Sequence, residues 1–214
     1  MFAGHYSAAF LAKRIDPGVP LWVLLLAVQL VDVFWALFIL LGIEHARVDP
    51  TLASSPLDLY HMPYTHSLVA TLGWALAAFV VARSLLGHTM SAVVIGLAVA
   101  SHWVLDLVVH RPDLSFWDGV MKMGFGLWDR PLVALALELA LLAASIGLLL
   151  EPPRLPSTTV RGVLFLGAAL AAVQLVVTFG PLPPSLTEMV VSALVLYLLV
   201  AWAGARLERQ PPAR

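Results

Sequence analysis

Residues 89–110 form a long apolar segment whose second half carries three polar side chains, His102, Asp106 and His110, at intervals of four residues. On an α-helix, residues four apart lie on one face, close enough for successive side chains to share a ligand. A carboxylate and two imidazoles are costly to bury in apolar surroundings unless something pairs with them. The segment therefore predicts a helix whose polar face either hydrogen-bonds to neighbouring helices or binds a ligand.

Composition identifies the chain as an integral membrane protein. Of its 214 residues, 61% are hydrophobic and 12% are charged, whereas soluble domains carry about 25% charged residues. The formal net charge is −1 and no run of basic residues occurs, so we expect no direct contact with nucleic acid. Cysteine is absent, so a metal ion would have to bind to His, Asp or Glu.

Several segments are long and apolar enough to cross a bilayer, which needs roughly 20 apolar residues. Residues 1–14 are too short to span and predict a short helix that ends at Lys13 and Arg14. We therefore predict an all-α, polytopic membrane helix bundle that forms a single domain over residues 1–214, with polar loops at 44–65 and 111–130. The predicted membrane helices are 20–43, 66–86, 89–110, 131–150, 159–179 and 185–205.

Basic residues are distributed unevenly between the two sides that these helices would create. Eight fall on the side of the chain termini and four on the other, so the positive-inside rule predicts that both termini are cytoplasmic. The eight are Lys13, Arg14, Arg83, Arg154, Arg161, Arg206, Arg209 and Arg214, and the four are Arg47, Arg111, Lys122 and Arg130.

With this orientation, the polar residues of the predicted helices gather in the outer half of the membrane and suggest a cavity there. Such a cavity is where a helix bundle can build a metal site from facing side chains. Helical rise allows His5 to reach it, because nine residues back from Arg14 cover about 13 Å. The alternative is a surface helix with His5 in water. The members of the polar set are Asp32, His66, His102, Asp106, Glu138, Gln174 and Glu188.

Imidazole and carboxylate ligands suit a divalent metal, with zinc as the first expectation and manganese or iron as alternatives. One or two ions are expected, since a carboxylate can bridge a pair of metals that polarises an ester and activates water. Glu138 is expected either to hydrogen-bond a ligating histidine or to be a protonated packing residue, and His61 to be a further ligand or an acid–base group. The candidate metal ligands are His5, Asp32, His66, His102 and Asp106, and the candidate catalytic residues are His61, Asp106 and Glu138.

The order of these residues resembles a family, the bacterial LexA-binding, inner-membrane-associated metal-dependent hydrolases. The resemblance covers residues 1–110, the half that carries the predicted metal site; residues 131–205 match only as generic membrane helices. It implies a multi-pass protein of the bacterial inner membrane, and Met62-Pro63 stands where that family has Arg-Gly. A weaker similarity is to the zinc-dependent phospholipase C and P1 nuclease group. The matching blocks are Gly4-His5, Asp32, the stretch from His61 to Ser67, and Ser101-His102 with Asp106.

We therefore expect a membrane-embedded metal-dependent hydrolase that acts on a phosphoester, small or lipid-linked, through a metal-activated water. Two alternatives stay open. The same residues would form an ion-coordinating or proton-relay path in a transporter, or a polar stripe that only holds helices together in a structural membrane protein. A cavity closed toward the cytoplasm favours the enzyme, and a continuous polar path favours transport.

Overall fold

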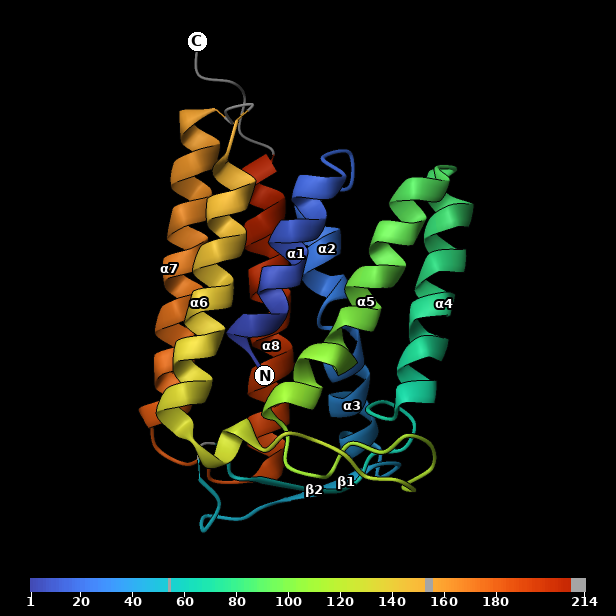
Figure 1. The fold of residues 1–214 in the computed structure, drawn as a ribbon, viewed down its shortest axis with the longest axis vertical. Helices are drawn as coiled ribbons and strands as arrows, with labels where there is room; N and C mark the ends of the chain where they lie inside the picture. Colours follow the sequence, from blue (N-terminus) through green and yellow to red (C-terminus); the bar gives the residue numbers. More distant parts are fainter. Residues whose placement is uncertain (54, 153–155, 209–214) are drawn as a thin grey trace.

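The computed structural model describes residues 1–53, 55–152 and 156–208, and these form a bundle of helices with a small two-stranded sheet at one end (Figure 1). The elements are α1 (Ala3–Ile15), α2 (Leu21–Ala27), α3 (Leu30–Leu40), β1 (His45–Val48), β2 (Leu57–His61), α4 (Leu68–Leu86), α5 (Thr89–Val109), the 3₁₀ turn η1 (Leu127–Asp129), α6 (Pro131–Leu150), α7 (Ser157–Phe179) and α8 (Leu186–Glu208).

The all-α membrane bundle predicted from the sequence is confirmed. Helices α4, α5, α6, α7 and α8 are each long and apolar enough to cross a membrane, and α2 with α3 makes a sixth if the bent pair counts as one span. The outer faces are apolar: on α4, for example, Leu76, Val81 and Leu85 are exposed. Exposed leucine and valine on a long helix are the surface that a bilayer would cover.

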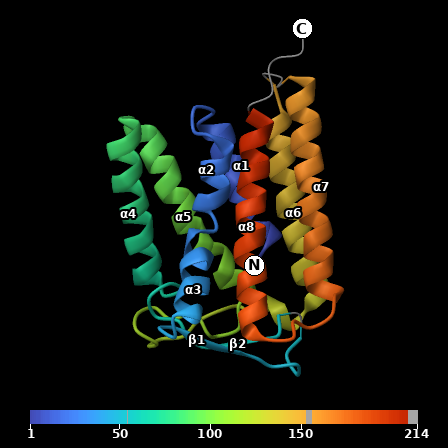
Figure 2. The same cartoon turned by 180° about the vertical axis from the view of Figure 1, so that it is seen from behind.

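The helices are arranged with α4 and α5 at one side, α6 and α7 at the other, and α1, α2, α3 and α8 between them (Figures 1 and 2). Helix α1 packs mainly against α6, α5 and α2, and α8 packs against α2 and α3. The start of α1 lies inside the bundle, nearer the hairpin end than the opposite end (Figure 1), and Ala3, His5 and Tyr6 are fully buried. The short N-terminal helix is thus a re-entrant element inside the bundle, and the alternative of a surface helix is not what the structure shows.

The first predicted span, residues 20–43, is broken. Helices α2 and α3 meet at a bend of 52°, with Val28 and Gln29 between them. Neither glycine nor proline stands there, so the sequence held no ordinary signal for a break. The bend places Asp32 in the first turn of α3, where the helix dipole favours a negative charge.

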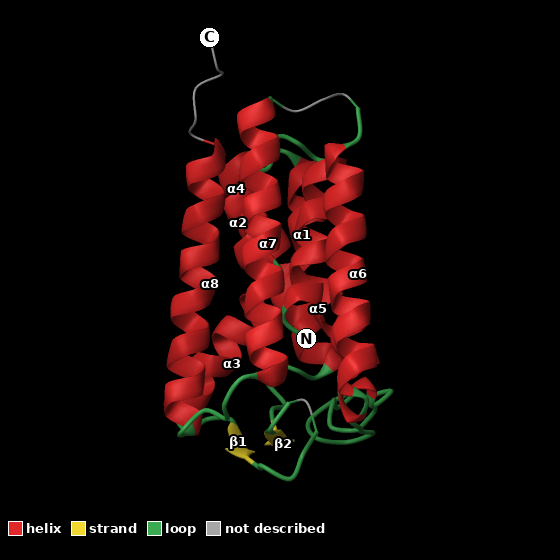
Figure 3. Ribbon diagram, turned by 90° about the vertical axis from the view of Figure 1, so that its left-hand side faces the viewer, coloured by secondary structure: helices red, strands yellow, loops and turns green. Residues whose placement is uncertain are grey.

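The predicted polar loop 44–65 contains a β-hairpin at the end of the bundle (Figure 3). Strands β1 and β2 are antiparallel, with His45 opposite His61 and Arg47 opposite Asp58. Leu57 and Leu59 alternate inward, as a half-buried strand requires. The hairpin lies under the helices together with the segment 111–130.

The segment 111–130 is tied to the start of α4 by backbone hydrogen bonds. Leu68 N–H donates to the Ser115 carbonyl at 3.0 Å, and Val69 N–H to that of Phe116 at 3.3 Å. These contacts satisfy donors that a helix N-terminus leaves free. In this segment Trp117 is exposed, whereas Trp128 is buried.

The contact between α4 and α5 depends on Gly96. A Cβ at this position would lie 3.2 Å from the Ala75 carbonyl oxygen and 3.3 Å from Phe79 Cβ, so a larger side chain forces the helices apart. We expect Gly96→Leu to lower the free energy of unfolding by roughly 1–3 kcal/mol, the usual cost of overpacking. Thermal unfolding in detergent measures the change.

Gly73→Leu on α4 is the matched control, because no atom lies within 4 Å of a Cβ there. Both substitutions gain the same helix propensity over glycine. Equal unfolding midpoints for the two variants would contradict a close α4–α5 contact at Gly96.

Candidate metal centre

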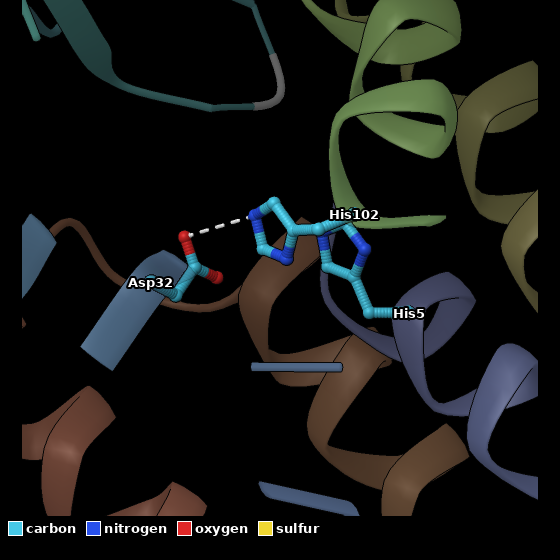
Figure 4. A group of neighbouring side chains, drawn as sticks. All are labelled: His5, Asp32 and His102. Atoms are coloured by element: carbon cyan, nitrogen blue, oxygen red, sulfur yellow. Dashed lines mark ion pairs between the residues drawn. The ribbon is translucent and has the colours of Figure 1, made fainter. Parts of the chain in front are cut away.

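Five of the predicted site residues meet inside the bundle: His5 from α1, Asp32 from α3, His66 from the residues before α4, and His102 and Asp106 from α5. We call these five residues the buried cluster. Two overlapping groups within it have ligand atoms that all lie within 4.8 Å of one another, namely His5, Asp32, His102 and His66, His102, Asp106. Figure 4 shows the first group, with the ring of His5 beside that of His102 and Asp32 opposite. The buried cluster can hold a metal ion.

The carboxylate of Asp106 has imidazoles on both of its oxygens. Its Oδ1 lies 3.1 Å from His5 Nε2, and its Oδ2 lies 3.2 Å from His102 Nε2 and 3.8 Å from His66 Nε2. The α-amino group of Met1 also contacts Oδ1. Asp106 therefore stands between two sets of ligand atoms, as a bridging carboxylate would.

Asp32 supplies the second carboxylate. Its Oδ1 lies 3.2 Å from His66 Nε2 and 3.5 Å from His102 Nε2 (Figure 4 marks the latter contact). Its Oδ2 accepts a hydrogen bond of 3.1 Å from the Tyr197 hydroxyl on α8. The Asp32 side chain keeps 17% of its surface exposed, whereas that of Asp106 keeps 1%. Asp32 is thus the most accessible member of the buried cluster.

The imidazole of His102 is held in one tautomer by the broken helix. Its Nδ1 lies 2.8 Å from the Val28 carbonyl oxygen, which can only accept, so Nδ1 carries a proton and, in the neutral ring, Nε2 carries the lone pair. Nε2 is fully buried and makes no hydrogen bond to any described residue, although two carboxylates lie beside it. Two carboxylates next to Nε2 require a cation there, either a proton on the ring or a bound metal ion.

His66 is oriented by a relay that the sequence interpretation missed. The Thr65 hydroxyl donates its proton to Glu44 Oε2 at 2.6 Å. The same hydroxyl lies 2.9 Å from His66 Nδ1 and therefore accepts the proton of that nitrogen, which directs Nε2 toward Asp32 Oδ1 at 3.2 Å. Glu44 is 1% exposed and also accepts from the backbone N–H groups of Tyr64 and Thr65.

His5 completes the buried cluster from the opposite side. Its ring is stacked on that of His102, with centroids 3.8 Å apart and planes at 7°. Both ring nitrogens are buried and lack a hydrogen-bond partner within the described part of the chain. Buried polar atoms are normally satisfied, so an imidazole of this kind needs a ligand that the protein chain does not itself provide.

Glu138 does not hydrogen-bond the histidines as expected; it caps α1. Its Oε2 accepts the backbone N–H groups of Phe2 at 2.9 Å and Gly4 at 3.2 Å. Gln174 from α7 accepts that of Ala3 at 3.1 Å. The two side chains satisfy free donors at the start of a buried helix, and in this way they hold His5 at its depth.

Two other expected members lie outside the buried cluster. His61 is an exposed residue of β2, where its ring is stacked on that of His45 with centroids 5.6 Å apart. His61 is the last residue of the strand, and it is exposed although alternation alone would place it on the same face as Leu57 and Leu59. Glu188 is exposed in the first turn of α8. Gln174 is buried, but it accepts a backbone N–H of α1 and does not contact the histidines of the buried cluster.

His110, by contrast, is buried next to the cluster. Its Nε2 lies 3.5 Å from Asp106 Oδ2, and its Nδ1 lies 2.8 Å from Asp113 Oδ1. Burial alone lowers the pKa of His110, but the carboxylates of Asp106 and Asp113 outweigh that effect and raise this pKa above its ordinary value. These two carboxylates would stabilise a cation next to His110, either a proton on the ring or a metal ion.

The geometry of the buried cluster is the evidence for what this chain does. Comparison with protein-family models, with curated proteins and with solved structures finds no match for it. The chemistry is therefore inferred from the ligand atoms themselves, which are imidazole nitrogens and carboxylate oxygens buried inside a membrane bundle.

Proposed function

We propose that this protein is a membrane-embedded, metal-dependent hydrolase and that the buried cluster is its active centre. The observation that carries the proposal is the meeting of three imidazoles and two carboxylates at a place where His5 and His102 Nε2 have no hydrogen-bond partner among the described residues. A structural polar stripe would pair those atoms with one another. A cation supplies the missing partner.

The spacing of the ligand atoms supports one or two divalent ions. Two ligand atoms bound at about 2.1 Å to one tetrahedral ion lie roughly 3.4 Å apart. The imidazole–carboxylate separations around Asp32 and Asp106 run from 3.1 to 3.8 Å. Nitrogen and oxygen donors without thiolate suit zinc, with manganese and iron as further candidates.

In this proposal Asp32, His66, His102 and Asp106 hold the principal ion, and His5 with the bridging Asp106 holds the second. Bound there, the metal supplies Lewis acidity that polarises an ester and lowers the pKa of water. The protein chain orients the ligands: Val28 and Thr65 fix the tautomers of His102 and His66. Tyr197 orients the Asp32 carboxylate.

The substrate that we propose is a phosphoester, either small or lipid-linked. Two features support it. Asp32 is the accessible side of the buried cluster, and it lies against α8, whose outer residues Leu198 and Trp202 are exposed and apolar. A substrate with a polar head and an apolar chain fits a site of this kind at the edge of a bundle.

The cellular setting is part of the proposal. The histidines and aspartates of the Gly-His, Asp, His-x-x-x-x-His-Ser and Ser-His-x-x-x-Asp blocks meet in the buried cluster, with the exception of His61. This agreement supports membership of the inner-membrane hydrolase family. We propose a bacterial inner-membrane location with the hairpin outside. Lys13, Arg14, Arg83, Arg161 and Arg206 lie at the end away from β1 and β2, which the positive-inside rule assigns to the cytoplasm.

Metal content is the first test. We expect protein purified in detergent to carry zinc or a similar ion that a chelator removes. His102→Ala and Asp106→Ala should each lose it because they remove central ligands. His45→Ala should retain it, since His45 is an exposed strand residue. Elemental analysis measures the content, and the same content in all four proteins would exclude the buried cluster as the metal site.

Hydrolysis is the second test. The metal-loaded protein should release phosphate from phosphoester substrates, including lipid phosphates in mixed micelles. His5→Ala should lower that rate by about a hundredfold or more, because metal stabilisation of a transition state is worth several kcal/mol. Ion flux into proteoliposomes without any hydrolysis would favour the transporter instead.

The Thr65 relay predicts a third result. Thr65→Val keeps the shape of the side chain but removes the hydroxyl that fixes His66, so we expect metal affinity to fall about 10- to 100-fold, as for other partners of ligating histidines. Thr65→Ser keeps the hydroxyl and should bind normally. Titration with metal in detergent measures both, and equal affinities for the two variants would remove Thr65 from this role.

A further inference from the structure

His110 lies one helical turn beyond Asp106, at the residue that ends α5. It is 2% exposed. Its backbone is held in place, because its carbonyl accepts the N–H of Gly126 at 2.7 Å and a Cβ at Gly124 would clash with it. The segment 111–130 thus wraps around this histidine and closes it off from one side.

The ring of His110 is oriented as firmly as its backbone. Trp128 packs on its face, with ring centroids 4.1 Å apart. The Asp113 carboxylate accepts the proton of Nδ1 at 2.8 Å. A carboxylate on Nδ1 is the usual partner of a metal-binding histidine, since it fixes the tautomer and makes the other nitrogen more basic. Nε2 is therefore the free nitrogen, and it points to Asp106.

The distance from His110 Nε2 to Asp106 Oδ2 is 3.5 Å, too long for a normal hydrogen bond. It does match the roughly 3.4 Å between two ligands of one tetrahedral ion. The same carboxylate oxygen lies 3.2 Å from His102 Nε2 and 3.8 Å from His66 Nε2. Each of these three histidines has its Nδ1 engaged elsewhere, by Asp113, Val28 and Thr65.

We infer that His110 is a further metal ligand, held by Asp113, and that it shares the Asp106 carboxylate with the group formed by His66, His102 and Asp106. The inference rests on the proposed metal centre and changes its composition. Imidazole nitrogens around a shared carboxylate select zinc, cobalt or iron over magnesium and calcium, which prefer oxygen donors. His5 and Asp32 form the other group with His102.

Cobalt(II) is the probe, because its visible absorption reports the number and kind of its ligands. We expect cobalt bound to the full-length protein in detergent to give the spectrum of a nitrogen-rich, low-coordinate site. His110→Ala should weaken cobalt binding and change that spectrum. Asp113→Ala should weaken binding about 10- to 100-fold with a smaller spectral change, because the ring remains. Binding of calcium should be weaker than that of cobalt in the unmodified protein.

Asp58→Ala is the matched control for Asp113→Ala, since Asp58 pairs with Arg47 on the hairpin and is remote from the site. Unfolding midpoints measured in the presence of a chelator show whether each variant is folded. If His110→Ala does not fold, Asp113→Ala tests the inference instead. Unchanged cobalt affinity and an unchanged spectrum in folded His110 and Asp113 variants would overturn this inference. The proposed metal centre itself would remain supported, because cobalt still binds. Absence of cobalt binding in the unmodified protein would overturn both.

Discussion

The contact of one buried carboxylate with several imidazoles is the interaction on which this structure depends. Asp106 keeps 1% of its side chain exposed, and a charge at that depth is costly unless it is paired. The pairing comes from α1, from the start of α4 and from the neighbouring turn of α5 itself. Helices that are far apart in sequence are thereby required to meet at one point, which lipid-facing packing alone would not specify.

The positions of the surrounding elements follow from the contacts that Asp106 and its imidazole partners require. Helix α1 begins inside the bundle, and its free N–H groups donate to Glu138 and Gln174 instead of to water. The α2–α3 break turns a backbone carbonyl toward His102. The hairpin brings Glu44 beneath Thr65. The short helix α1, the α2–α3 break and the hairpin each differ from a regular spanning helix. Each of them places a polar group next to a specific hydrogen-bond partner.

Much of this arrangement could be predicted from the sequence, and the exceptions have physical reasons. The spacing of His102 and Asp106 is local, and a helix converts it directly into a shared face. His61 also belongs to a recognisable block, but it forms the end of a strand, where its ring stacks on that of His45 instead of reaching the buried cluster. Glu44 lies 20 residues from Tyr64, and only the hairpin joins them. The break at Val28 involves no glycine or proline, and the partner of Glu138 depends on how far α1 enters the bundle.

The bend between α2 and α3 has a thermodynamic consequence. In a continuous helix the Val28 carbonyl would accept the N–H of Asp32, four residues on; in the bent form it accepts the ring proton of His102. Straightening the helix would therefore release the imidazole, and bending it would orient the Nε2 lone pair. Because linkage is reciprocal, any ligand that binds this lone pair more tightly in the bent form stabilises the bend by the same free energy that the bend contributes to binding. The bend of the α2–α3 backbone and the binding of a ligand at His102 Nε2 are therefore thermodynamically coupled.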